Sequence, residues 1–158
     1  MTDEHKDERY TPRELTELAH RLLEHVDLDP CTTYEVNRKG INARQWFGVS
    51  QDGLKQIWTG RTFVNPPGSK KKEFAHKLAN SLDLLPAAIW LEYNWDHSTE
   101  ALNVLLDKKP IVALLRKRVK FSGYEVGRSQ AFLIWGVPVS LVRSVMGGNA
   151  TILECYRG

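Results

Sequence analysis

At 158 residues, with 42% hydrophobic and 26% charged residues, the chain has the size and composition of one globular domain with a substantial apolar core. It contains no stretch of about 18 apolar residues, which excludes a transmembrane helix. Its two cysteines are too few for a disulfide framework or a zinc cluster. The formal net charge of +3 is too small to indicate a nucleic-acid partner without the positions of the basic residues.

The amino-terminal part of the chain predicts a short tail followed by a helix. Residues 1–9 carry no apolar periodicity and no signal-peptide core, so we expect a disordered tail, one domain over residues 10–158 and a cytoplasmic location. Thr11 before Pro12 is typical of a capped helix start, and Glu14 completes a capping-box pattern. Apolar residues then recur at helical spacing: Leu15, Leu18, Leu22, Leu23 and Val26.

A short extended segment, Leu28-Asp29-Pro30-Cys31, follows this helix and ends at the proline. A carboxylate at a strand end can hold an ammonium group through a charge-assisted hydrogen bond, although an ordinary Asp-Pro turn explains the same residues. Residues 36–60 are polar and read as irregular, with Asp52-Gly53 as a turn signal. We expect the aromatic residues of this region to pack onto a sheet: Trp46, Phe47 and Trp58.

The most informative stretch runs from Arg61 to Gly68. Thr62-Phe63-Val64 predicts a buried strand, and Pro66-Pro67 stops it because proline cannot donate to a sheet ladder. Asn65 is therefore expected at the carboxyl end of a strand, where open α/β sheets bind their ligands. The prolines fix the backbone, so the Asn65 side chain and the Pro66 carbonyl can accept two hydrogen bonds from one amino group.

After Gly68 the chain alternates between helices and strands. Ser69 can cap a helix that runs to Leu82, and three lysines at its start could seat a phosphate or a carboxylate. The remaining elements are expected as strands over 87–91, 111–115, 130–136 and 151–156, a helix over 98–106 and a further element from 137. This alternation predicts an α/β sandwich with a mixed sheet that is parallel in its first half.

Five motifs, in their order along the chain, resemble the phage-type DNA N6-adenine methyltransferase family, whose members use S-adenosylmethionine. These motifs span roughly residues 9–136 and are Tyr10-Thr11-Pro12, Leu28-Asp29-Pro30-Cys31, Asp52-Gly53-Leu54 with Trp58, Phe63-Val64-Asn65-Pro66-Pro67 and Arg118-Val119-Lys120-Phe121. The resemblance implies a compact, reduced Rossmann-like methyltransferase sandwich. Residues 32–35 contain no glycine, so the glycine-rich cofactor loop of larger methyltransferases is absent.

The resemblance also implies a role for each matching residue. The catalytic residues are Asn65, Pro66 and Pro67, which receive the N6 amino group of adenine. The cofactor-binding residues are Tyr10, Thr11, Pro12, Asp29, Pro30 and Cys31. The DNA-binding residues are Gly68, Lys70, Arg118, Lys120 and Phe121. Gly68 stands where many relatives carry an aromatic residue, so Phe121 is the expected stacking ring for a flipped base, with a plain core position as its alternative.

The implied partners are DNA and S-adenosylmethionine in a bacterial host cell, with a phage or prophage origin and a place in restriction-modification. Four cations between Arg116 and Lys120 suit DNA phosphates, and the histidines show no metal-ligand spacing, so no metal site is expected. A chain of this size leaves DNA site recognition to its loops or to a homodimer partner. Two alternatives remain: amino-methylation of cytosine N4, RNA or a glutamine amide, and a degenerate methyltransferase fold that binds nucleic acid or protein.

Overall fold

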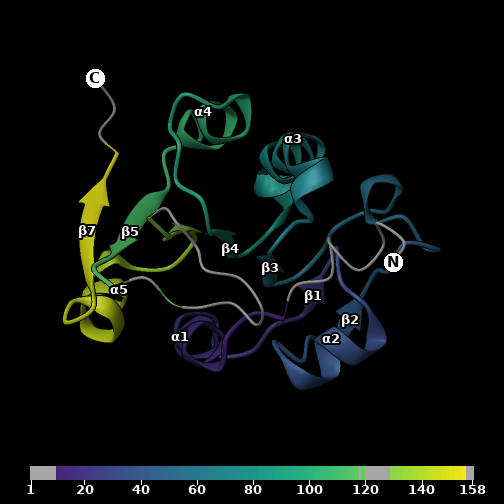
Figure 1. Ribbon diagram of the computed structural model, residues 1–158, viewed down its shortest axis with the longest axis horizontal. Helices are drawn as coiled ribbons and strands as arrows, with labels where there is room; N and C mark the ends of the chain where they lie inside the picture. The colour runs from purple at the N-terminus through teal and green to yellow at the C-terminus, as the bar shows by residue number, and fades with distance from the viewer. Residues whose placement is uncertain (1–9, 118, 120–128, 156–158) are drawn as a thin grey trace.

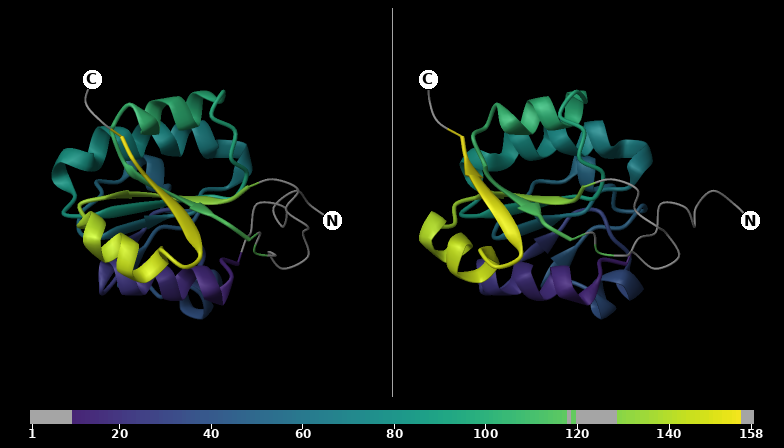
Figure 2. Two further views of the ribbon diagram at one scale, coloured as in Figure 1. Left: turned by 90° about the vertical axis from the view of Figure 1, so that its left-hand side faces the viewer. Right: turned by 60° about the vertical axis from the view of Figure 1, so that its left-hand side comes forward.

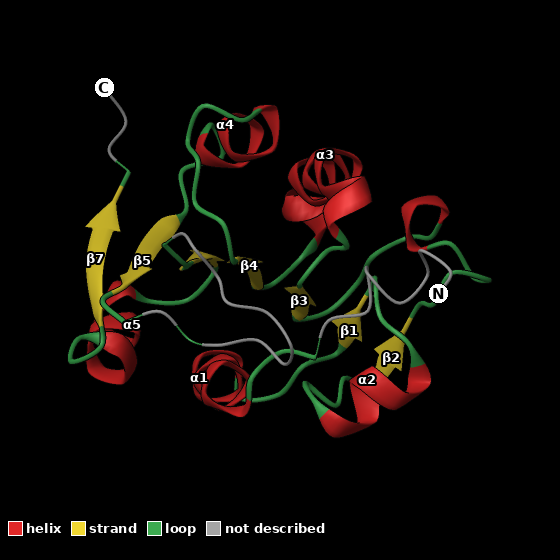
Figure 3. Ribbon diagram, viewed as in Figure 1, coloured by secondary structure: helices red, strands yellow, loops and turns green. Residues whose placement is uncertain are grey.

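One mixed β-sheet carries the fold, and helices cover both of its faces. The computed structural model describes residues 10–117, 119 and 129–155. The strands in chain order are β1 (Leu28–Asp29), β2 (Gln45–Trp46), β3 (Thr62–Val64), β4 (Ala88–Glu92), β5 (Ile111–Leu115), β6 (Ala131–Trp135) and β7 (Ala150–Glu154). Within the sheet their order is β2-β1-β3-β4-β6-β5-β7, as the secondary-structure colouring of Figure 3 helps to trace.

The helices form an outer layer on each side of this sheet. They are α1 (Arg13–Leu23), α2 (Tyr34–Lys39), α3 (Lys71–Ser81), α4 (Glu100–Leu106) and α5 (Val139–Met146), with short 3-10 turns η2 (Gly53–Lys55), η3 (Gly68–Lys70) and η4 (Leu82–Leu84). Figure 1 shows α1, α2 and α5 on one face and α3 and α4 on the other. The two views of Figure 2 show the same layering from the side.

Strand pairing is parallel at one side of the sheet and antiparallel at the other. Strands β2, β1, β3 and β4 pair in parallel, with Val64 of β3 opposite Trp90 of β4. Strand β6 runs antiparallel between β4 and β5, and β7 runs antiparallel to β5. The prediction of a mixed α/β sheet that is parallel in its first half is therefore confirmed.

The central strands are apolar on both faces, because each face is covered by helices. Phe63 and Ile89 pack on the side of α1 and α5, while their neighbours Val64 and Trp90 pack on the side of α3 and α4. All four of these side chains are fully buried. The carboxyl ends of β3 and β4 are thereby held in a rigid position at one edge of the sheet.

Two predicted helix caps are wrong. Helix α1 begins at Arg13 with Pro12 in the capping position and no side-chain cap, because the Thr11 hydroxyl bonds elsewhere. Helix α3 begins at Lys71, after the 3-10 turn η3, and also lacks a side-chain cap, so Ser69 does not start it.

Residues 36–60 are more ordered than the sequence suggests. Thr33 caps α2 by accepting a hydrogen bond from Val36 N at 3.2 Å. The buried Asn37 side chain then makes two hydrogen bonds to the backbone of Ala43, which leads the chain into β2. Phe47 and Trp58 are buried as expected, and Trp46 is half-buried. The proposed tail, residues 1–9, lies outside the described residues.

Candidate functional site

The carboxyl ends of β1 and β3 flank a topological switch point, where the order in which the strands are added to the sheet reverses. These strands are neighbours, yet the chain leaves β1 toward β2 on one side and leaves β3 toward β4 on the other. The helices that follow them, α2 and α3, lie on opposite faces of the sheet (Figure 1). In open α/β sheets ligands bind at such a switch point. Asp29 ends β1 there, and Asn65 follows β3 directly.

The side-chain amide of Asn65 is fixed at one end and unpaired at the other. Its Nδ2 donates to Oγ1 of Thr11 at 3.0 Å, which sets the orientation of the amide. Its Oδ1 is buried and has no hydrogen-bond partner, a state that it shares with only one other side-chain atom of the described residues, Oδ1 of Asn94. A buried polar atom without a partner costs about 1–3 kcal/mol. At a ligand-binding edge, this acceptor is suited to a donor that a ligand supplies.

Asp29 is a buried carboxyl group beside this amide. Its Oδ1 accepts a hydrogen bond from Cys31 N at 3.2 Å, and among the described residues no Lys, Arg or His pairs with it. Burial raises the pKa of Asp29 to about 7, and the bond from Cys31 N opposes this rise. The described residues therefore supply no cation that would stabilise the carboxylate.

Cys31 joins Asp29 to Asn65. Burial raises the pKa of its thiol well above the ordinary value, the charge of Asp29 raises it further, and a backbone hydrogen bond with Asn65 opposes both. The thiol is thus held in its neutral form. Together with the bond from Asn65 to Thr11, these contacts gather four residues that we call the switch-point cluster: Thr11, Asp29, Cys31 and Asn65.

The turn after β2 packs against the backbone of the Asp29-Pro30 segment. A Cβ atom on Gly53 would lie only 1.9 Å from the Pro30 carbonyl oxygen, so the two backbones touch in a way that a larger residue would prevent. The indole Nε1 of Trp58 donates to Gly53 O at 2.8 Å and pins this turn. Phe47 N donates to Asp29 O at 3.0 Å on the same segment. These contacts explain why Asp52-Gly53 and Trp58 accompany the Asp-Pro segment.

A buried ion pair ties the start of α3 to the end of β4. Glu92, which has no exposed side-chain surface, pairs with the ammonium group of Lys71. Glu92 also accepts hydrogen bonds from Trp90 Nε1 at 3.1 Å and from Asn94 N at 3.3 Å. The Lys71 ammonium lies 5.5 Å from the centre of the Tyr93 ring, within reach of a cation–π interaction. Lys71 thus anchors the loop that carries Asn65 and is not free to bind a phosphate.

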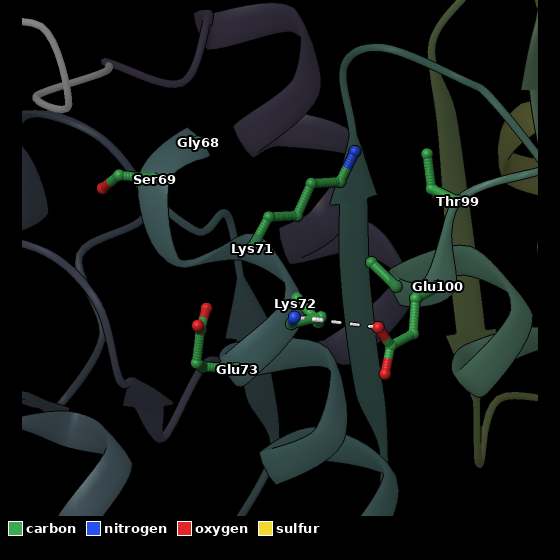
Figure 4. A pocket seen from close by; sticks show the side chains of 8 residues that line it. Gly68, Ser69, Lys71, Lys72, Glu73, Thr99 and Glu100 are labelled. Atoms are coloured by element: carbon green, nitrogen blue, oxygen red, sulfur yellow. Dashed lines mark ion pairs between the residues drawn. The ribbon is translucent and has the colours of Figure 1, made fainter.

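An open surface hollow of about 360 Å³ lies between the first turns of α3 and α4 (Figure 4). Across it, Lys72 pairs with Glu100 at 3.8 Å, and His76 Nε2 lies 3.0 Å from the same carboxylate. The bond with His76 is the main reason why the pKa of Glu100 is lowered. This hollow is lined by charges of both signs, and its two lysines, Lys71 and Lys72, already pair with Glu92 and Glu100, so it offers no clear ligand chemistry.

The sequence-predicted residues divide into three groups in space. The switch-point cluster brings together one catalytic candidate, Asn65, and three cofactor candidates, Thr11, Asp29 and Cys31. The prolines next to them in the sequence are buried or half-buried: Pro12, Pro30, Pro66 and Pro67. Tyr10, Gly68 and Lys70 are exposed. Arg118, Lys120 and Phe121 lie outside the described residues.

From the sequence, three residues at this edge had no specific role: Glu92, Asn94 and Lys71, which was expected only as one of three lysines that could seat a phosphate or a carboxylate. Glu92 and Asn94 could have been found from the sequence, because the apolar run 87–91 changes abruptly to the polar residues Glu92-Tyr93-Asn94 at a strand end. The partner of Glu92 could not be identified in this way, because Lys71 is 21 positions away and sits among other lysines.

No protein-family model matches the chain, and no curated protein matches it. Over residues 10–117, 119 and 129–155, no group of three or more His, Cys, Asp and Glu side chains could hold a metal ion. Each helix in that part of the chain is too short or too polar to cross a membrane.

Proposed function

We propose that this chain methylates the exocyclic N6 amino group of adenine in DNA, with S-adenosylmethionine as the methyl donor. The observation that carries the proposal is the buried, unpartnered Oδ1 of Asn65 at the switch point of the sheet. A fixed acceptor without a partner suits a substrate amino group, which brings N–H donors. The order of the five motifs in the sequence supports the same assignment.

Asn65 acts on the amino group through hydrogen bonding. An adenine amine is a weak nucleophile because its lone pair is delocalised into the ring. Asn65 Oδ1 accepts a hydrogen bond from one N–H of the amine, and the Pro66 carbonyl oxygen accepts a hydrogen bond from the other. This pairing favours a pyramidal nitrogen. As the nitrogen gains positive charge, the bond to Oδ1 strengthens, so the contribution is largest in the transition state. Thr11 keeps the amide oriented, and no reorganisation is needed when the substrate arrives.

The residues present fit the amino-acid end of S-adenosylmethionine. Asp29 is a buried carboxylate without a cationic partner in the described chain, and an ammonium group would supply that partner. Cys31 contacts Asp29 and Thr11 contacts Asn65, and both would form walls of this subsite. The cofactor, when bound, supplies a methyl group that is already activated, so the chain has only to position and orient the methyl donor and the substrate amino group.

The edge of the sheet that carries Asn65 also carries exposed cations. Strand β5 runs parallel to β4, because both pair antiparallel with β6, so their carboxyl ends meet at one edge. Arg116 and Lys117 follow β5 there and are exposed. Exposed cations beside a base-binding site suit the phosphates of DNA.

The test is a methyl-transfer assay that identifies the methylated atom. The protein is incubated with isotopically labelled S-adenosylmethionine and unmethylated plasmid DNA, and the DNA is digested to nucleosides and separated. We expect the label in N6-methyldeoxyadenosine and its loss with Asn65→Ala. Label in N4-methyldeoxycytidine would move the acceptor to cytosine. A folded wild-type protein that transfers no label to DNA would overturn the proposal.

A further inference from the structure

We infer that Asn94 is a second substrate-binding amide, which accepts a hydrogen bond from the target nucleotide beside Asn65. Oδ1 of Asn94 is buried and has no partner, and it shares this state only with Oδ1 of Asn65 among the side-chain atoms of the described residues. Both residues lie just beyond the carboxyl ends of neighbouring strands, β4 and β3. The identity of the ligand rests on the proposed function, whereas the unpaired oxygen does not.

The backbone around Asn94 is held on both sides. Asn94 N donates to Glu92 Oε1 at 3.3 Å, and Trp95 N donates to Ser129 O at 2.8 Å. Glu92 itself is fixed by Trp90 and by Lys71. The unpaired oxygen therefore belongs to a segment that hydrogen bonds hold on both sides.

The same clamp links Asn94 to the loop of Asn65. Lys71 is the first residue of α3, directly after the turn that Pro66 and Pro67 begin, and its ammonium group reaches Glu92 and the ring of Tyr93. In Figure 4 its side chain extends away from Lys72 and Glu73. One ion pair thus fixes both loops relative to each other, as two halves of one binding site require.

A comparison within the chain separates a structural amide from a ligand-binding one. Asn37 is also a buried asparagine, but its Nδ2 donates to Ala43 O at 3.0 Å and its Oδ1 accepts from Ala43 N at 2.8 Å. Such pairing is the normal state of buried amides. Asn94 lacks it on the oxygen. Because an amide oxygen can only accept, the missing partner must be an N–H or O–H donor, such as those of a nucleotide base or sugar.

The first test measures the stability of the ligand-free protein. Asn94→Leu removes the unpaired acceptor and should keep or raise the unfolding temperature, by about 2–4 °C if the penalty is about 1 kcal/mol. Asn37→Leu is the matched control, and it should lower the unfolding temperature because it leaves two Ala43 groups unpaired. If Asn94→Leu lowers it as strongly as Asn37→Leu does, the oxygen has a structural partner and the inference is overturned.

The second test measures steady-state methylation of unmethylated plasmid DNA by Asn94→Ala. We expect the KM for DNA to rise about tenfold, with the Kd for S-adenosylmethionine unchanged, as for a lost substrate hydrogen bond. Asn80→Ala, at an exposed position of α3, should behave like the wild type. An unchanged KM in Asn94→Ala, or a change in cofactor affinity instead, would overturn the inference alone. A wild-type protein without activity would overturn the proposed function, and with it the assignment of the ligand.

Discussion

Thr11 and Asn65 are 54 positions apart in the chain and are joined by one hydrogen bond, in which Asn65 Nδ2 donates to Thr11 Oγ1 at 3.0 Å. In this arrangement the NH2 end of the amide is paired, and Oδ1 is the end left unpaired. Without it the side chain loses a contact that holds it in place, and an amide that rotates would present its NH2 group, a donor, where the proposed reaction requires an acceptor.

Thr11→Val should therefore lower methylation turnover. Valine has nearly the shape of threonine but cannot accept the bond, so we expect a decrease of roughly 3- to 10-fold, the value of one ordinary hydrogen bond. Thr11→Ser keeps the hydroxyl and should keep most of the activity. Single-turnover methylation measures both variants. Equal rates for Thr11→Val and the wild type would show that the bond does not orient Asn65.

Asn65→Ala should lower turnover much more and leave cofactor binding nearly intact. In the proposed reaction its oxygen acts mainly in the transition state, so we expect a loss of roughly a hundredfold or more in kcat, as for one preorganised hydrogen-bonding group. Asn65→Asp retains an acceptor oxygen and should keep part of the activity. Calorimetric titration with S-adenosylmethionine gives the affinities. Wild-type turnover in Asn65→Ala would make Asn65-Pro66-Pro67 a structural turn.

The position of Asn65 at the end of a buried strand could be predicted from the sequence, because the relevant signals are local. The apolar run Thr62–Val64 followed by Pro66-Pro67 fixes the strand end by steric and hydrogen-bonding rules alone, and Asn65 stands at that end. The switch point needs more, since it depends on which strands pair. The sequence predicted a parallel first half but no strand order.

The failures have a common cause. Thr11 carries a strong local capping pattern, yet its hydroxyl bonds to Asn65, a contact that no pattern of neighbouring residues encodes. The pairing of Lys71 with Glu92 is missed for the same reason. From the sequence, Lys71 is expected to be a surface residue because it lies in a run of lysines. Only the packing of α3 against β4 shows that it is paired. Long-range polar contacts are the part of this site that required the structure.

Asp29 should make the stability of the protein depend on pH. Its pKa is raised by burial from 3.8 to about 7 in the folded state. The folded state therefore keeps a proton that the unfolded state releases, so the free energy of unfolding should fall as pH rises from about 4 to about 7 and level off above. The contribution is on the order of 4 kcal/mol. Asp29→Asn should flatten this slope, as chemical unfolding at several pH values will show.

The affinity for the cofactor should depend on the protonation state of Asp29. An ammonium group binds the ionised form of Asp29, so the affinity for S-adenosylmethionine should rise between about pH 6 and pH 7.5, with proton release on binding. Calorimetry in two buffers of different ionisation enthalpy measures the released proton. Asp29→Asn should bind more weakly and release none. Proton uptake by the wild-type protein would place the cofactor elsewhere.

Gly53→Ala should destabilise the protein and weaken cofactor binding together. The added Cβ would lie 1.9 Å from the Pro30 carbonyl oxygen, so the backbone must move by more than 1 Å, at a cost of about 1–3 kcal/mol. Because Pro30 adjoins Asp29 and Cys31, that movement reaches the switch-point cluster. Gly148→Ala is the control, since its Cβ would meet no atom within 4 Å. Equal unfolding temperatures for the two variants would contradict the close contact.

The pair of Lys71 and Glu92 should show strong coupling in a double-mutant cycle. Glu92 has no exposed side-chain surface, and Lys71 is only 18% exposed, so removing one partner leaves a largely desolvated charge. Lys71→Met alone should therefore cost about 3–5 kcal/mol of unfolding free energy, whereas Lys71→Met with Glu92→Gln should cost clearly less. Urea unfolding of the wild type, the two single variants and the double variant gives the four values. Lys72→Met is the matched control: its partner Glu100 is more than half exposed, so the expected loss is about 0–1 kcal/mol. If Lys71→Met proves as mild as Lys72→Met, the pair does not hold the loops of Asn65 and Asn94 together.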